Sequence, residues 1–73
     1  MEAEIFNKEC GYLRRDRMVR VWLADGHAIE GFPLDHVKAD NCDGSLLIET
    51  NRGPINLPSS SIKSIEPLID LEA

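Results

Sequence analysis

The segment Arg17-Met-Val-Arg-Val-Trp-Leu-Ala-Asp-Gly-His-Ala-Ile-Glu-Gly-Phe32 contains two strand-like runs on either side of an Asp-Gly pair. Such a pair between apolar-rich runs is a strong short-range signal for a β-hairpin. Three further strand-like runs follow, which cover residues 45–50, 54–57 and 62–66. Five short strands joined by tight turns predict a mainly β fold, a small five-stranded barrel over residues 17–68. Such a barrel leaves little interior room for a catalytic pocket, so we expect the function to lie on its surface.

Alternation along these runs separates a core-facing set from a solvent-facing set. In the first run Val19, Val21 and Leu23 alternate with Arg20 and Trp22, so the aliphatic side chains should face inward. The third run, which begins at Ser45, is apolar on both faces, so its second face is either covered or an interface. We expect ten aliphatic residues to form the core: Val19, Val21, Leu23, Ile29, Leu46, Ile48, Ile55, Leu57, Ile62 and Ile65.

Residues 2–13 are predicted to form a short helix before the barrel. Phe6, Cys10 and Leu13 are spaced by four and by three, so they share one helical face. A helix of this length is marginal alone. We therefore expect the Phe6 face to pack on the barrel, with a partner-binding helix as the alternative.

Trp22 should face away from the barrel core, which is unusual for the single tryptophan of a chain. We expect Trp22 and Met18 to cover a second small cluster beneath the helix. An exposed Trp22 would instead be an anchor for a protein partner. Residues 34–44 form the longest expected connection, and residues 69–73 an expected frayed tail, so the 73 residues make one domain.

Composition excludes several classes of protein. Hydrophobic residues make up 42% of the chain, which is enough for a globular fold, but the apolar runs are too short to span a membrane. The first residues lack the basic start and apolar stretch of a secretion signal, so we expect a cytoplasmic protein. Cys10 and Cys42 are then most simply free thiols, with a disulfide between them as the minor alternative.

Charge is distributed unevenly along the chain. Residues 1–23 carry four acidic and five basic side chains, a net +1, whereas residues 24–73 carry nine acidic and three basic side chains, a net −6. An acidic barrel repels a phosphate backbone and suits a basic protein surface. Acidity that only aids solubility is the alternative.

The sequence contains no recognisable catalytic or metal-binding constellation. His27, His36 and Cys42 do not form the paired spacings of a zinc site. The loop Asp40-Asn-Cys-Asp-Gly44 lacks the alternating acids and distal glutamate of a calcium loop. No nucleophile is accompanied by a base, and no glycine-rich phosphate loop occurs. We therefore expect no enzymatic activity, no cofactor and no metal.

The order of these elements resembles the Sm-like fold, one of the small SH3-like barrels with an N-terminal helix. The residues that carry the resemblance are Val19, Val21, Leu23, Asp25, Gly26, Ile29, Gly31, the run Leu46-Leu-Ile48, Ile62 and Ile65. The turn Pro58-Ser-Ser-Ser61 lacks the Lys-His pair that RNA-binding Sm-like rings such as Hfq carry there. Arg52-Gly53 is similar to the Arg-Gly of other Sm proteins but falls one turn earlier.

Within that fold the chain is similar to the Rof family of small acidic inhibitors of the transcription termination factor Rho. The shared features are an N-terminal helix with a cysteine, the Asp25-Gly26 turn and an aspartate ten positions later, Asp35. The resemblance implies binding to the RNA-binding domain of Rho through acidic residues, which blocks RNA loading.

Two functional hypotheses follow from these observations. The first is a protein-binding regulator that engages a basic partner, with Rho as the first to try, through acidic residues: Asp25, Glu30, Asp35, Asp40 and Asp43. The alternative is direct RNA binding through a basic cluster beside an aromatic ring. That cluster consists of Arg14, Arg15, Arg17, Arg20, Trp22 and Arg52.

Overall fold

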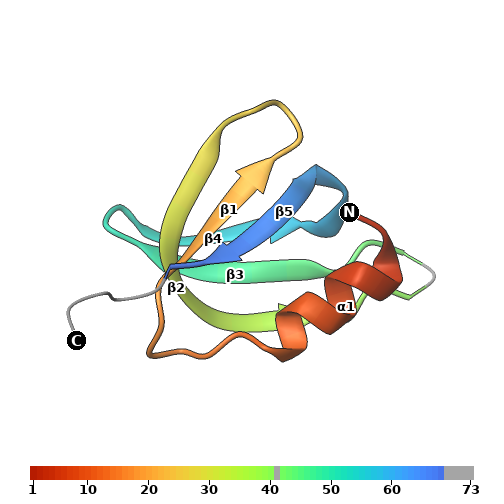
Figure 1. The fold of residues 1–73 in the computed structure, drawn as a ribbon, viewed down its shortest axis with the longest axis horizontal. Helices are drawn as coiled ribbons and strands as arrows, with labels where there is room; N and C mark the ends of the chain where they lie inside the picture. Colours follow the sequence, from red (N-terminus) through yellow and green to blue (C-terminus); the bar gives the residue numbers. More distant parts are fainter. Residues whose placement is uncertain (41, 69–73) are drawn as a thin grey trace.

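One helix and five antiparallel strands make up the computed structural model, which describes residues 1–40 and 42–68 (Figure 1). The elements are α1 (Ala3–Gly11), β1 (Val19–Leu23), β2 (Ala28–Val37), β3 (Ser45–Thr50), β4 (Gly53–Pro58), the 3₁₀ turn η1 (Ser59–Ser61) and β5 (Ile62–Pro67). The strands form a single sheet in the order β4-β3-β2-β1-β5. The mainly β fold with an N-terminal helix is therefore confirmed, although α1 is shorter at both ends than the predicted 2–13.

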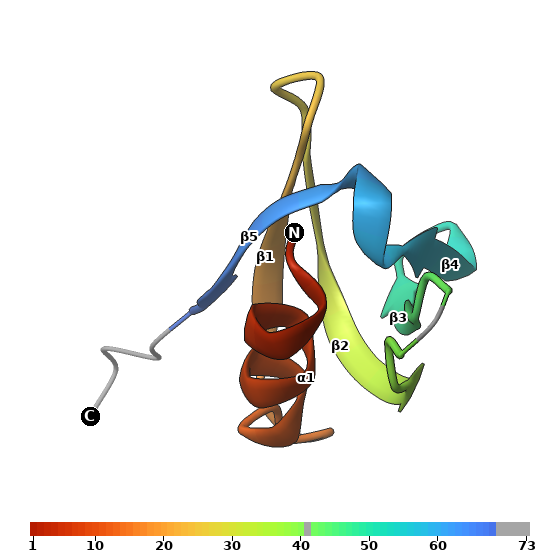
Figure 2. The same ribbon diagram turned by 90° about the vertical axis from the view of Figure 1, so that its right-hand side faces the viewer.

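The sheet is curved but open. Strands β4 and β5 are its two edges, and within the described ranges no pairing between them closes it. The predicted closed barrel is thus not confirmed. Figure 2 shows how the curvature brings the far ends of β2, β3 and β4 around the side on which α1 lies.

The long strand β2 joins the two halves of the sheet. It pairs with β1 as far as Gly31 and with β3 from Phe32 onward. A Cβ atom on Gly31 would overlap the carbonyl oxygen of Glu49, so glycine permits this close crossing of β2 and β3. The register then shifts between Pro33 and Asp35. Pairing with β3 resumes after this bulge, so our prediction that the strand ends at Phe32 was wrong.

Because of its position in the ladder, Pro33 does not end β2. Pro33 lies opposite Ile48, and a residue without an N–H group fits a pair that exchanges no hydrogen bonds. The strand therefore continues to Val37. The connection to β3 consists of residues 38–44 rather than the predicted 34–44.

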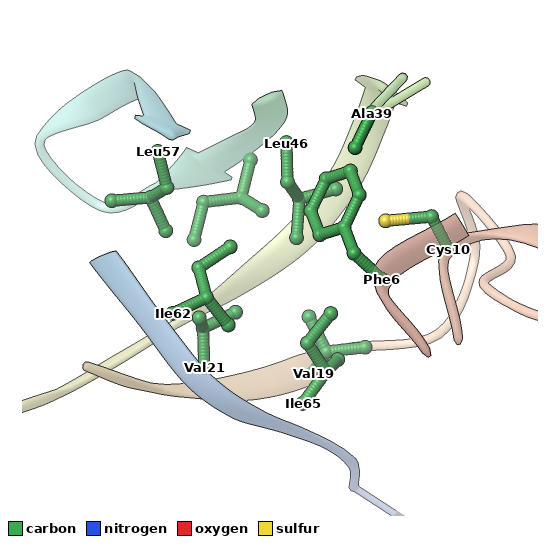
Figure 3. Packing of buried hydrophobic residues seen from close by; sticks show 10 residues of the cluster. Phe6, Cys10, Val19, Val21, Ala39, Leu46, Leu57, Ile62 and Ile65 are labelled. Atoms are coloured by element: carbon green, nitrogen blue, oxygen red, sulfur yellow. The ribbon is translucent and has the colours of Figure 1, made fainter. Parts of the chain in front are cut away.

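The helix packs on the sheet through Phe6 and Cys10, as predicted. Figure 3 shows the Phe6 ring reaching from α1 toward Leu46 and Ala39. The Asn7 side chain fixes the helix to the loop, since it accepts from the Ala39 amide and donates to the Ala39 carbonyl, both at 2.7 Å. Trp22 is not beneath this helix. It is 36% exposed on the outside of β1, so the predicted second cluster was wrong.

The core matches most of the predicted set. Seven of the ten expected residues are buried, and the other three, Leu23, Ile29 and Ile55, are half-buried and pack against them. Phe6 and Cys10 of the predicted helix face complete the core, together with Ala39, which the prediction missed. Burial raises the pKa of the Cys10 thiol to about 11, whereas Cys42 is exposed, and both are free thiols.

Prolines line the free edges of the sheet. In β4, Pro54 and Pro58 lie opposite Glu49 and Ser45, and because proline has no N–H group these pairs must be the non-hydrogen-bonded ones. In both prolines the backbone nitrogen, which carries no hydrogen, therefore faces the free edge of the sheet. Pro67 occupies the equivalent position on β5. Edge prolines discourage addition of another strand.

Residues 69–73, the predicted tail, lie outside the described residues. Among the described ones, no helix has the length and apolar character needed to cross a membrane.

Candidate protein-docking surface

The convex side of the sheet, opposite the core, carries the candidate site, which we call the outer face. Partners in an antiparallel ladder share a face, so the outward residues follow from the register. Near β1 they are Met18, Arg20, Trp22, Ala28, Glu30, Phe32, Ser64 and Glu66. Near β3 they are Asp35, Val37, Ser45, Leu47, Glu49, Pro54, Asn56 and Pro58.

Large apolar side chains are exposed along this face. Phe32 is 39% exposed at the bend of β2, where its outward neighbours are Met18, just before β1, and Glu49 on β3. Val37 is exposed at the end of β2. Exposed aromatic and aliphatic side chains grouped on one surface are typical of a contact site for another macromolecule.

Charge on the outer face is predominantly negative. It holds one basic residue, Arg20, against four acidic ones: Glu30, Asp35, Glu49 and Glu66. The net charge is therefore −3. Interfaces with an apolar centre and a charged rim gain orientation from the charges and affinity from the centre.

Around Trp22 the charges are already paired within the chain. The guanidinium of Arg20 lies 2.7 Å from Glu30 and 3.7 Å from Glu66 and stands 5.9 Å from the centre of the Trp22 ring. The indole N–H of Trp22 donates to Glu66 at 3.1 Å. These four side chains form one network, which we call the Trp22 cluster. Direct cross-strand pairing of Arg20 with Glu30 and Glu66 brings it together.

Around Asp35 the arrangement is different. Asp35 accepts a hydrogen bond from the backbone N–H of His36 at 2.8 Å, and no cation within residues 1–40 and 42–68 forms an ion pair with it. The carboxylate lies at a pocket of about 120 Å³ on the outer face. The pocket is lined by Asp35, His36, Val37, Ser45, Leu47 and Asn56. On the helix side, Asp35 also lines a larger hollow together with Arg15.

The structure does not bring the five predicted acidic residues together. Asp25 lies in the β1–β2 turn, which stands apart at the top of Figure 1, while Asp40 and Asp43 lie in the loop at the other end of β2. Only Glu30 and Asp35 share the outer face.

Two of the predicted carboxylates have structural roles. Asp25 accepts from the His27 backbone at 2.9 Å and lies 3.0 Å from its imidazole. These contacts lower the pKa of Asp25 and raise that of His27. Asp43 accepts from the Ser60 hydroxyl at 2.7 Å and so fastens the loop to η1. Nearby, the buried Ser59 hydroxyl accepts from the Gly44 amide at 3.1 Å.

The predicted RNA-binding residues are also dispersed. Arg14, Arg15 and Arg17 lie in the connection before β1, where Arg14 pairs with Asp16 at 3.4 Å. Arg52 lies in the separate β3–β4 turn. Arg20 and Trp22 are on the outer face, within the Trp22 cluster. The three groups therefore lie on different elements of the fold: the α1–β1 connection, β1 and the β3–β4 turn.

Sequence reasoning missed several residues of the outer face, chiefly Phe32, Leu47, Glu49, Asn56 and Glu66. Alternation gave a usable signal for the first three, because Phe32 follows Ala28 and Glu30 at even spacing and Glu49 follows Leu47. The alignment of Asn56 and Glu66 depends on the register between strands, which single-strand patterns do not specify.

Among the residues that the structure describes, no group of three or more His, Cys, Asp or Glu side chains is placed to hold a metal ion. Comparison of the chain with protein-family models, with curated proteins and with solved structures gave no match.

Proposed function

We propose that the chain is a non-enzymatic, protein-binding regulator that engages a basic protein surface through the outer face. The observation that carries the proposal is the grouping of exposed apolar side chains with carboxylates on one convex surface. Phe32 lies at its centre, with Glu30, Glu49 and Asp35 around it. Acidic residues of this surface steer a basic partner, and the apolar residues supply buried contact area on docking.

A folded protein partner is favoured over RNA by the chemistry around Trp22. Stacking of a base on this ring would place the phosphates near Glu66 and Glu30, and the one arginine beside the ring is already paired with both. A net charge of −5 further opposes the phosphate attraction that supplies most nucleic-acid affinity.

We further propose a Sm-like fold and, as the first partner to test, the termination factor Rho, whose RNA loading the chain would block as the resemblance to the Rof family implies. The order of one helix and five antiparallel strands supports the fold. The edge prolines Pro54, Pro58 and Pro67 support a single Sm-like unit that does not assemble into a ring through its strand edges.

The test is a binding measurement on purified Rho at low and at physiological ionic strength. We expect affinity to fall with salt, because complementary charge is screened. The variant Asp35→Asn/Glu49→Gln, which neutralises the two outer-face carboxylates that form no ion pair within the described residues, should bind at least about tenfold more weakly, equivalent to about 1.4 kcal/mol. The matched variant Arg14→Glu/Arg15→Glu/Arg17→Glu should bind a basic partner at least as tightly as wild type.

If Rho does not bind, the same pair of variants is used as bait in cell extract. Recovery of a basic protein by the wild type and the Arg variant, but not by the Asp35→Asn/Glu49→Gln variant, would support the regulator without Rho. Equal recovery by all three baits would contradict docking through carboxylates.

A further inference from the structure

The pocket beside Asp35 combines an apolar floor with an anionic rim. Its volume is about 120 Å³, and it opens on the outer face between β2, β3 and β4. We propose that this pocket receives one arginine or lysine side chain of the partner protein. The inference rests on the proposed function, because it specifies the chemical group that the partner contributes.

The apolar part of the pocket suits the stem of such a side chain. Leu47 is half-buried opposite Asp35 in the β2–β3 ladder, and the exposed Val37 forms a wall. Arginine and lysine bury their methylene groups on apolar surfaces of this kind while the charged head remains near polar groups.

The polar part suits the head group. One oxygen of Asp35, Oδ1, accepts from the His36 backbone, which orients the carboxylate. Ser45 and Asn56 line the same pocket and add a hydroxyl and an amide oxygen. A guanidinium carries five N–H donors and forms its strongest hydrogen bonds with an ionised acceptor.

Asp35, like Glu49 on the same face, has no competing cation among the described residues, whereas the other two outer-face carboxylates do. Within the described residues, Glu30 and Glu66 are engaged by Arg20, and Asp25 by His27. Arg15 and Asp35 both line the hollow on the helix side, yet the two residues form no ion pair.

A second hollow on the sheet lacks these features. The one beside Trp22 is lined by Trp22, Leu23, Gly26, Lys63 and Ser64, so it contains a cation and no carboxylate. It would repel a basic side chain that the Asp35 pocket attracts.

The experiment is an NMR titration of the isotope-labelled full chain with N-acetyl-arginine methylamide at low ionic strength. The neutral isostere N-acetyl-citrulline methylamide serves as the ligand control. We expect arginine to shift the amide signals of Val37, Leu47 and Asn56, and citrulline to leave them unchanged. Asp35→Asn should weaken binding by about tenfold, whereas Asp40→Asn, in the exposed loop, should leave it unchanged.

Two further variants test the pocket by gain of affinity, which loss of folding cannot mimic. Asn56→Asp adds a second carboxylate to the lining, and Arg15→Gln removes a basic residue that lines the hollow on the helix side of Asp35, so each should tighten arginine binding by several-fold. Shifts spread equally over all exposed carboxylates, or an Asp35→Asn variant that binds as wild type, would overturn the inference. Partner binding that is lost in Glu49→Gln but kept in Asp35→Asn would also overturn it, while leaving the proposed function in place.

Discussion

The two halves of the outer face carry similar numbers of carboxylates but use them differently. In the half formed by β2, β1 and β5, Arg20 neutralises Glu30 and Glu66, and Trp22 is drawn into the same network. In the half formed by β2, β3 and β4, Asp35 and Glu49 form no ion pair within the described part of the chain. Internally paired charges contribute little attraction to a partner, so we expect the proposed docking to depend more on the Asp35 half.

This difference shows why a count of acidic residues does not locate a binding surface. The five carboxylates predicted from the sequence include Asp25, which stabilises a turn, and Asp43, which stabilises a loop. They also include Glu30, which already forms an ion pair with Arg20. What distinguishes Asp35 is the combination of an unpaired carboxylate with apolar neighbours and a pocket. Substitutions in the shared core, at the bend, in the Trp22 cluster and at the β1–β2 hairpin test this comparison.

The largest expected effect comes from the core that both halves share. Ile48, on β3, is fully buried. Replacing it with alanine removes buried methylene groups and leaves a cavity, so Ile48→Ala should lower the free energy of unfolding by about 2–5 kcal/mol. Chemical denaturation followed by Trp22 fluorescence measures this loss. The exposed Val37→Ala, at the end of β2, is the control and should change stability by less than about 0.5 kcal/mol.

The bend between the halves should be nearly as sensitive. A methyl group on Gly31 would overlap the Glu49 carbonyl, so Gly31→Ala should destabilise the protein by about 1–3 kcal/mol and disturb the alignment of β2 with β3. Gly11→Ala, at the end of α1, introduces the same methyl into open space and should be neutral or slightly stabilising. Similar thermal midpoints for the two variants would contradict the close crossing at Gly31.

Much of the fold was predictable because its signals are local. The strand Ser45–Thr50 was predicted at its observed bounds, since an apolar run lies between polar turn residues. The length of β2 was not predictable, because whether Pro33 ends a strand depends on the partner that its missing N–H group would face. Trp22 was misplaced for a similar reason. Its stabilising partner, Glu66, lies far along the chain and meets it only through the β1–β5 register.

The Trp22 cluster can be opened to test the alternative hypothesis of RNA binding. Wild-type protein should bind labelled single-stranded RNA no more tightly than the roughly 10⁻⁴–10⁻⁶ M of non-specific contacts at physiological salt. Glu30→Gln/Glu66→Gln releases Arg20 and removes two negative charges, so it should raise RNA affinity by several-fold. The same double variant should retain binding to a basic protein through the Asp35 half. Tight RNA binding by the wild type would contradict the assignment of this half.

The smallest effect is expected at the hairpin turn of the Trp22 half, where Asp25 and His27 form an exposed pair. The raised pKa of His27 means that its contribution to stability is complete below its ordinary value of 6.5 and is lost as pH rises through the raised pKa. The lowered pKa of Asp25 means that its contribution is present above its ordinary value of 3.8 and is lost as pH falls through the lowered pKa. The pair should therefore stabilise the turn most between about pH 4 and pH 6.5. The difference in thermal midpoint between wild type and His27→Asn should be greatest in that window and should shrink above it. A difference in thermal midpoint that stays constant from about pH 5 to pH 8 would show that His27 acts through turn geometry alone. The ion pairs that contribute to this half would then be those of Arg20.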